Sequence, residues 1–285
     1  MARANAFWPR DKGWNGSKWQ VRRGEIFVRE NTPPQYEGII CLVHGFGEHG
    51  GRYAHVAEFF NKNGFAFLTM DSRGHGKSGG KRGHTPNFDH FLDDIDLFLM
   101  DTKQRLDNVP MFLYGHSMGG NLTLNYVIRR KPTILRGLVT TGPWIRLAFE
   151  PKPILITLGK IMRSIYPTFT QDSDLDVTGL SRDKAVVDAY VNDPLVHSKI
   201  TASCGMGMTD SAAFLNTYAG AMPIPTLIEH GTDDAVISQP SSEEFARRVS
   251  NVTYKKWQGL YHEIHNEPEK MVVLNDILAW INKQM

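Results

Sequence analysis

The chain has 285 residues, of which 41% are hydrophobic and 22% are charged, and its formal net charge at pH 7 is +2. One α/β domain with an insertion is the simplest account of this length, and the nearly balanced charge gives no indication of nucleic-acid binding. Two cysteines, Cys41 and Cys204, exclude a disulfide framework, and the sequence contains neither an internal repeat nor a cluster of metal-ligand residues.

The N-terminal sequence bears on location. The first nine residues lack the continuous apolar run of a secretory signal, and no segment is as long as a membrane-spanning helix. We therefore expect a cytoplasmic protein, with peripheral contact with lipid left open. The sequence does not indicate an oligomeric state.

Short apolar runs bounded by breakers predict eight strands. The first two would pair antiparallel and open the sheet, and the later ones alternate with helices. Such alternation builds a mostly parallel sheet with helices on both faces. The predicted strands are residues 18–21, 25–29, 38–43, 65–70, 111–114, 135–140, 225–230 and 252–257.

Apolar residues at helical spacing predict helices near residues 52–63, from about residue 89 to 106, and over 269–283. Asn87 and Asp89 are both candidates for the N-cap of the second helix. The apolar residues of that helix are Phe91, Leu92, Ile95, Phe98 and Leu99. In the last helix, the residues expected to face inward are Met271, Val272, Leu274, Ile277, Leu278 and Trp280.

Residues 145–221 interrupt the alternation, because this stretch is too long for one connection and too apolar for a disordered segment. We interpret it as a helical cap inserted between a first core part, residues 1–144, and a second, residues 222–285. Within it, residues 153–162 predict a helix whose apolar side chains cover more than one core-facing stripe. Two interpretations stay open: this helix packs against the domain only, or it is a lid that touches membrane.

A serine lies in the sharpest predicted turn of the chain. The pentapeptide Gly115-His116-Ser117-Met118-Gly119 follows the strand 111–114 and precedes a predicted helix that begins near residue 121. A strand, a tight turn and a helix around a serine form a nucleophile elbow. The flanking glycines avoid clashes that a Cβ would make there. The elbow exposes the Ser117 Oγ and directs the Met118 N–H toward an oxyanion.

A serine nucleophile needs a base, and the base needs an orienting carboxylate. On this kind of scaffold the acid and then the histidine follow the serine in the chain. Asp234 lies in the turn after the strand 225–230, and His262 lies in the loop after the strand 252–257. Because catalytic groups collect at the carboxyl ends of strands in open parallel sheets, these two residues are the expected partners of Ser117.

Each partner has an alternative nearby. Asp233 precedes Asp234, and either aspartate could simply serve the turn, which aspartate favours. His265 follows His262 by three residues, and eleven histidines allow a coincidence. Distance from the strand end favours His262, whereas chemistry alone leaves the two aspartates open.

A second N–H donor should complement that of Met118 at an oxyanion. The strand 38–43 runs into His44-Gly45-Phe46-Gly47, a glycine-rich loop in the position where such hydrolases place the second donor. Phe46 would then supply the second N–H. The loop lacks the Lys-Ser/Thr ending and the glycine spacing of phosphate-binding loops.

Five segments together resemble the monoacylglycerol lipases and related lysophospholipases of the α/β-hydrolase fold. They occur in the family's order, from about residue 40 to residue 265. The segments are HGFGEHGGRY at 44–53, DSRGHGKS at 71–78, GHSMGG at 115–120, HGTDD at 230–234 and GLYH at 259–262. The middle of the chain matches this family far less clearly.

The resemblance implies a serine ester hydrolase without a cofactor, which releases fatty acid from a monoacylglycerol or a similar single-chain lipid ester through an acyl-enzyme. It implies that Asp234 and His262 fill the acid and histidine positions. It also implies that Glu48, Arg52 and His265 line the polar end of the pocket.

Other functions stay open beside this one. A broad carboxylesterase or a lysophospholipase differs mainly in the cap, and a peptidase of the same fold and a non-catalytic binding protein are more distant alternatives. A complete set of Ser117, Asp234 and His262 argues against the binding protein. If the cap is a lid, it should line an acyl tunnel, with Leu155 and Leu158 as tunnel residues.

Overall fold

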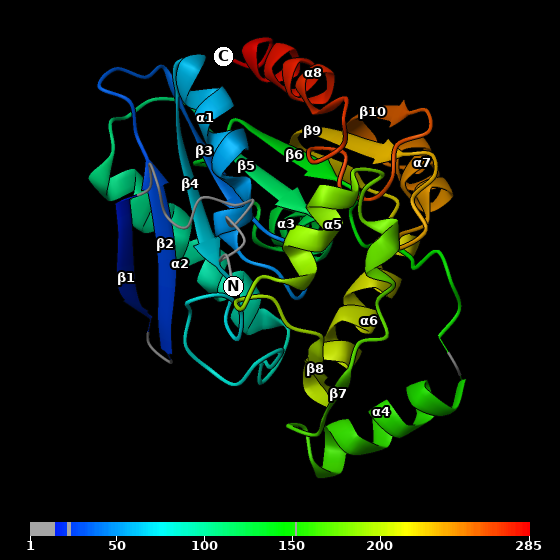
Figure 1. Cartoon of the computed structure of the whole chain (residues 1–285). Helices are drawn as coiled ribbons and strands as arrows, with labels where there is room; N and C mark the ends of the chain where they lie inside the picture. Colours follow the sequence, from blue (N-terminus) through cyan, green and yellow to red (C-terminus); the bar gives the residue numbers. More distant parts are fainter. Residues whose placement is uncertain (1–14, 22–23, 152) are drawn as a thin grey trace, which may run out of the picture.

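The computed structural model describes residues 15–21, 24–151 and 153–285 and contains a central sheet covered by helices on both faces (Figure 1). The predicted fold class, a mostly parallel sheet between two helical layers, is confirmed. The strand order is β1-β2-β4-β3-β5-β6-β9-β10, with antiparallel pairing only at β1–β2 and β2–β4. The strands of this sheet are β1 Asn15–Val21, β2 Gly24–Asn31, β3 Gly38–Val43, β4 Phe65–Asp71, β5 Met111–His116, β6 Gly137–Thr141, β9 Ala221–Gly231 and β10 Ser250–Trp257.

The helices are α1 Ala54–Lys62, α2 Asp89–Arg105, α3 Met118–Arg130, α4 Pro153–Ile165, α5 Lys184–Val191, α6 Ala202–Thr217, α7 Gln239–Arg248 and α8 Lys270–Asn282, with short 3-10 turns η1 Gly50–Tyr53 and η2 Val177–Gly179. The helices predicted individually from the sequence correspond to α1, α2, α3, α4 and α8, whereas α5, α6 and α7 had no individual prediction.

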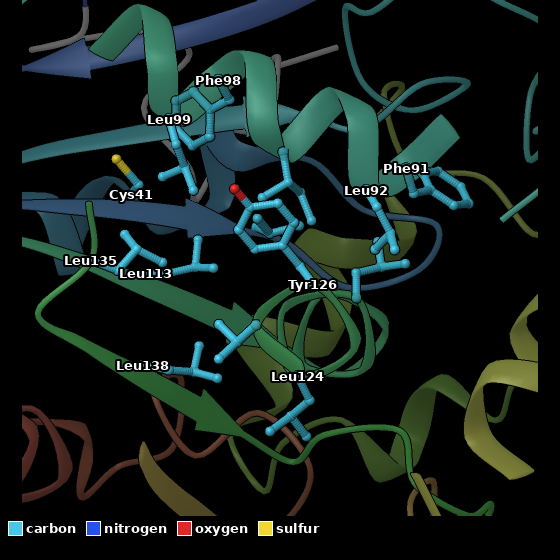
Figure 2. Close-up of a cluster of buried hydrophobic side chains, with 14 of the residues drawn as sticks. Cys41, Phe91, Leu92, Phe98, Leu99, Leu113, Leu124, Tyr126, Leu135 and Leu138 are labelled. Atoms are coloured by element: carbon cyan, nitrogen blue, oxygen red, sulfur yellow. The ribbon is translucent and has the colours of Figure 1, made fainter. Parts of the chain in front are cut away.

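The strand β3 shows how the sheet is buried on both sides. Ile39, Cys41 and Val43 belong to an apolar cluster with α2 and α3, part of which Figure 2 shows. Ile40 and Leu42 point to the opposite face and pack with α1 and α8. Alternate residues of a strand face opposite sides, so a strand between two helical layers must be apolar throughout. The continuous apolar runs in the sequence follow from this double burial.

Two details of the helices differ from the sequence predictions. Phe88, rather than Asn87 or Asp89, is the N-cap of α2, although the Asn87 Oδ1 still accepts a hydrogen bond from the His90 N–H. In α8, Met271 and Val272 are 52% and 59% exposed, because the helix begins at Lys270 and packs only one stripe onto the sheet. That stripe consists of Val273, Leu274, Ile277, Trp280 and Ile281.

The region between β6 and β9 holds α4, α5, α6 and a small antiparallel sheet of β7 Thr170–Asp172 and β8 Lys199–Thr201. α6 packs on α3 and contributes Cys204, Met208 and Leu215 to a core cluster. α4 has no buried residue and lies beside α6 at the outer edge of the molecule (Figure 1). The cap boundaries at 145 and 221 stay a prediction. Within the described residues, no helix combines the length and apolar character needed to cross a bilayer.

Parallel strands bring the loops that follow them to one edge of the sheet. The loops after β3, β5, β9 and β10 therefore meet, although they come from residues near 44, 117, 234 and 262. These are the loops in which the sequence places its candidate residues.

The close contact between α3 and β3 can be tested with a methyl group. A Cβ at Gly119 would overlap the carbonyl oxygen of Val43 and lie 2.6 Å from that of His44. We expect Gly119→Ala to lower the free energy of unfolding by about 3 kcal/mol, because neither backbone can move away. Urea denaturation with an unchanged m-value measures the loss.

Gly159→Ala in α4 is the matched control. Its new Cβ would lie 3.0 Å from the flexible Met206 Sδ. The free energy of unfolding should therefore stay within about 1 kcal/mol of the wild-type value. Equal effects of the two substitutions would contradict the tight α3–β3 contact.

Candidate active site

Ser117 lies between the end of β5 and the first residue of α3 and has φ 55° and ψ −116°. A residue other than glycine rarely adopts a positive φ, and such a strained backbone persists only where surrounding contacts fix it. Here the Ser117 N–H donates to the Thr141 carbonyl oxygen at 3.0 Å, and the Ser117 carbonyl oxygen accepts from the Trp144 N–H at 3.0 Å. A Cβ at Gly115 would collide with the Gly119 carbonyl group. The tight turn expected from the sequence is therefore present.

Asp234 and His262 meet next to this turn. The His262 Nδ1 lies 2.7 Å from the Asp234 Oδ2. Since a carboxylate only accepts hydrogen bonds, Nδ1 carries the proton, which leaves the His262 Nε2 free to act as a base. The Asp234 Oδ1 accepts from the backbone N–H groups of Val236 and Ile237, each at 2.8 Å. Ser117 and His262 both line the same cavity.

Asp234 and His262 shift each other's pKa in opposite directions. Burial by itself raises the pKa of the Asp234 carboxyl, but the charge of His262 and hydrogen bonds from His230 and His262 hold that pKa well below its usual value. Burial lowers the pKa of His262, but the charge and hydrogen bond of Asp234 outweigh it and raise the pKa overall. Asp234 therefore stays ionised and stabilises a proton on His262.

The two alternatives from the sequence lie elsewhere. Asp233 is exposed, and its Oδ1 accepts from the Thr232 hydroxyl at 2.8 Å. His265 is buried, and its ring stacks on Tyr53 with centroids 4.9 Å apart. Within the described part of the chain, neither ring nitrogen of His265 has a hydrogen-bond partner. The structure thus brings Asp234 into contact with His262 and not with His265.

The loop after β3 packs directly against the elbow. A Cβ at Gly45 would lie 3.2 Å from the Ser117 Cβ. Phe46 lines the cavity beside Ser117, and Gly47, with φ 76°, turns the chain away behind it. Met118 is the first residue of α3, so its N–H belongs to the N-terminal donors that have no acceptor within a helix. The Phe46 and Met118 N–H groups come from two segments that flank Ser117.

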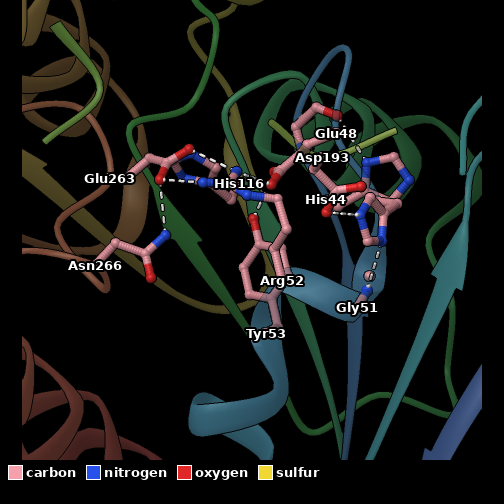
Figure 3. A network of polar contacts seen from close by, with 12 residues as sticks. His44, Glu48, Gly51, Arg52, Tyr53, His116, Asp193, Glu263 and Asn266 are labelled. Carbon is pink, nitrogen blue, oxygen red and sulfur yellow. Dashed lines mark hydrogen bonds and ion pairs between the residues drawn. The ribbon is translucent and has the colours of Figure 1, made fainter. Parts of the chain in front are cut away.

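A buried polar network holds this loop in place (Figure 3). The Arg52 guanidinium contacts Glu263 through two nitrogens at 2.7 Å each and also pairs with the Glu48 Oε2. The Glu48 Oε1 accepts from the Gly45 N–H at 2.6 Å and from the Tyr53 hydroxyl at 2.7 Å. Burial raises the pKa of Glu48, but Arg52 and nearby groups outweigh it and lower this pKa to about 2. The Glu48 carboxylate is therefore ionised.

The three residues expected at the polar end of the pocket have different positions. Glu48 lines the cavity, whereas Arg52 and His265 are fully buried and are not among the lining residues. Sequence reasoning missed Glu263, which lines the cavity and pairs with Arg52. Its place directly after His262 was the available signal. A contact of any of these residues with a substrate stays a prediction.

The cavity has a volume of about 450 Å³ and extends from Ser117 under α4 and α6. Leu155 and Leu158, the expected tunnel residues, both line it. Among the described residues, no group of three or more histidine, cysteine or acidic side chains could hold a metal ion. The apolar part of the lining consists mainly of Phe46, Trp144, Leu147, Phe149, Leu155, Ile156, Leu158, Phe169, Leu175, Leu180, Ile200, Met206, Val236 and Ile237.

Comparisons with known proteins identify relatives of this chain in sequence and in fold. Residues 34–269 match the family described as "Serine aminopeptidase, S33". The chain is 35% identical over 254 residues to the monoacylglycerol lipase of Mycolicibacterium smegmatis, which covers 88% of this chain and 89% of that protein. Its structure is similar to the crystal structure of the Paleococcus ferrophilus monoacylglycerol lipase, with a TM-score of 0.83, 30% identity and coverage of 91% and 99% of the two chains.

Another relative is much longer than this chain. An uncharacterised abhydrolase domain-containing protein of Dictyostelium discoideum is 35% identical over 249 residues, which make up 86% of this chain. The match spans only 26% of that relative's length.

The contact between Asp234 and His262 predicts which aspartate supports the serine. Asp234→Asn should slow labelling of Ser117 by a serine-directed fluorophosphonate about 10,000-fold, because the imidazole loses its orienting charge and tautomer. Asp233→Asn is the matched control and should label at nearly the wild-type rate, since its side chain is exposed and accepts a hydrogen bond from the Thr232 hydroxyl. If the Asp233 variant were the slow one, the assignment of the acid would be wrong. Labelling rates followed by mass spectrometry decide this.

Proposed function

Because the chain belongs to the serine aminopeptidase S33 family and has the α/β-hydrolase fold, we propose that it is a serine hydrolase that cleaves monoacylglycerols to fatty acid and glycerol. One observation carries the proposal: the elbow serine and the Asp234–His262 pair open into a cavity with a long apolar lining. Its 35% identity to a monoacylglycerol lipase supports the same substrate class.

The geometry supports a two-step ester hydrolysis. His262 Nε2 removes the Ser117 proton as Oγ bonds to the ester carbonyl carbon. The Phe46 and Met118 N–H groups stabilise the oxyanion, and the bond to the alcohol oxygen breaks as His262 passes its proton to glycerol. A water molecule then attacks the acyl-enzyme by the same route and releases the fatty acid. No step requires a cofactor.

The charges around the cavity favour an uncharged head group. Of the described lining residues, none is lysine or arginine, and the acidic ones are Glu48, Glu150, Asp172, Asp174 and Glu263. A phosphate head group would find no cationic partner among them and would be repelled. Glycerol hydroxyls, in contrast, can donate hydrogen bonds to carboxylates. This favours monoacylglycerols over anionic lysophospholipids, with Glu48, Arg52 and His265 forming or supporting the polar end.

The outer face of α4 supports contact with a lipid surface. Ile154 and Ile165 are 73% and 75% exposed, and Ile161 is 50% exposed. Lys160 on the same helix adds positive charge, whereas Arg163 is paired with Asp210. Exposed apolar residues beside basic ones are typical of helices that lie in a membrane interface. We propose that α4 docks on lipid and that single-chain esters enter the cavity beneath it.

The proposed substrate class is tested by kcat/KM against acyl chain length. Each buried CH₂ contributes about 0.8 kcal/mol, so longer monoacylglycerols should have a lower KM until the cavity is full. One triacylglycerol and one lysophosphatidylglycerol, assayed alongside, should react more slowly. Ser117→Ala provides the inactive background. A flat chain-length profile or a preference for the triacylglycerol would contradict the proposal.

A charge within the cavity should separate long from short substrates. Leu158→Glu should depress long-chain activity more than hydrolysis of a short aryl ester, because the acyl chain would pass a carboxylate. Thr157→Glu is the matched control, since Thr157 is exposed on the same helix, does not line the cavity and is not one of the apolar residues proposed to dock on lipid. Equal losses in the two variants would point to damage to the helix instead.

The lipid contact of α4 is tested by vesicle sedimentation. Replacing Ile154 and Ile165 together by serine should weaken partition onto monoacylglycerol-containing vesicles about tenfold, because two apolar side chains are lost from the interface. Hydrolysis of a water-soluble short ester should not change. Replacing Met271 and Val272 of α8 by serine removes similarly exposed apolar residues from the opposite end of the molecule (Figure 1) and should leave partition unchanged. A loss in both double variants would contradict docking through α4.

A further inference from the structure

The Asp234 carboxylate has a second histidine partner besides His262. His230, near the end of β9, is fully buried, and its Nε2 lies 2.9 Å from the Asp234 Oδ2. This is the same oxygen that the His262 Nδ1 contacts at 2.7 Å. The other oxygen, Oδ1, is already occupied by two backbone N–H groups. Two imidazoles therefore share one carboxylate oxygen as their acceptor.

The orientation of His230 is fixed from its other side. The His230 Nδ1 lies 2.9 Å from the Ser242 Oγ in α7, and Ser242 is also fully buried. Because the carboxylate can only accept, the His230 Nε2 must carry a proton, and the Ser242 hydroxyl can donate to Nδ1. Nε2 also lies 3.3 Å from the Ile237 carbonyl oxygen. A single tautomer thus satisfies both ring nitrogens and directs an N–H at Asp234.

We propose that His230 is a positioning residue that holds Asp234 in place and limits how strongly its carboxylate attracts the His262 proton. This inference rests on the proposed function, since it assigns His262 as the base. An N–H donated to Oδ2 withdraws negative charge from that oxygen. Without this donor, Asp234 would stabilise protonated His262 more strongly, and the pKa of His262 would rise further.

The other charged and titratable groups around His262 come from several segments. They are Glu263 beside it, Glu48 after β3, and the rings of His116 and His265. None of these is hydrogen-bonded to His230. A substitution of His230 therefore leaves them in place, and a shift of the His262 titration can be attributed to the lost N–H.

The test is the pH dependence of two reactions, short-ester kcat/KM and fluorophosphonate labelling of Ser117. Both need neutral His262, so both fall as the pH drops through its pKa. His230→Leu should move this acidic limb upward by about half a pH unit or more and lower kcat. His230→Gln keeps an N–H donor of similar reach and should return the limb close to its wild-type position. Leu138→Ala, in the core away from the site, controls for lost stability.

The outcomes distinguish a failure of the proposed function from a failure of the role proposed for His230. Absence of Ser117 labelling in the wild type would overturn the proposed function. A labelled wild type whose acidic limb stays fixed in His230→Leu, with only a lower Tm as in Leu138→Ala, would overturn the role of His230. If His230→Leu does not fold, Ser242→Ala serves instead. It weakens the same N–H donor and should shift the limb upward by a smaller amount, and an unshifted limb there would also overturn the proposal.

Discussion

The buried Arg52 guanidinium is the interaction on which the arrangement of the site depends. It joins Glu48, in the loop after β3, to Glu263, in the loop after β10, and Glu263 lies 211 residues beyond Arg52 in the chain. Removing three charges from water is costly, so the network is stable only because each group is paired and hydrogen-bonded. Glu48 in turn holds the Gly45 N–H. One cation therefore fixes the loop beside Ser117 relative to the loop that carries His262.

The parallel sheet supplies the second constraint. Ser117, Asp234 and His262 follow β5, β9 and β10, and these strands all end at one edge. The sheet brings the three loops to the same edge, and hydrogen bonds then fix the orientation of the Asp234 and His262 side chains. Asp234 shows this division, because a tight turn with two backbone donors orients one oxygen and two histidines share the other. A carboxylate with every acceptor site used has little freedom to rotate, which suits a residue that must hold an imidazole in one orientation.

The helices over the site are less uniformly buried than the sheet and its loops. α6 is anchored in the core, whereas α4 has no buried residue and presents apolar side chains both to the cavity and to solvent. The apolar side chains of α4 cover more of the helix than one stripe. This is explained if one side of the helix contacts an acyl chain and the other side contacts a lipid surface. No residue of α4 takes part in the hydrogen bond between Asp234 and His262, so loss of α4 contacts would leave that bond intact.

The sequence alone determined the features that depend on neighbouring residues. Apolar runs predicted the strands, and glycines around Ser117 predicted the strained turn. Tertiary structure decided the rest, because a local pattern does not show which groups meet over long distances. Asp233 and Asp234 are both suited to a turn, and the folded chain brings Asp234 rather than Asp233 against His262, in agreement with the resemblance. The resemblance predicted Arg52 at the polar end of the pocket but not its burial, and the sequence left Glu263 unnoticed. A buried charge is stable only when it is paired, and it is the folded chain that brings Glu263 to Arg52.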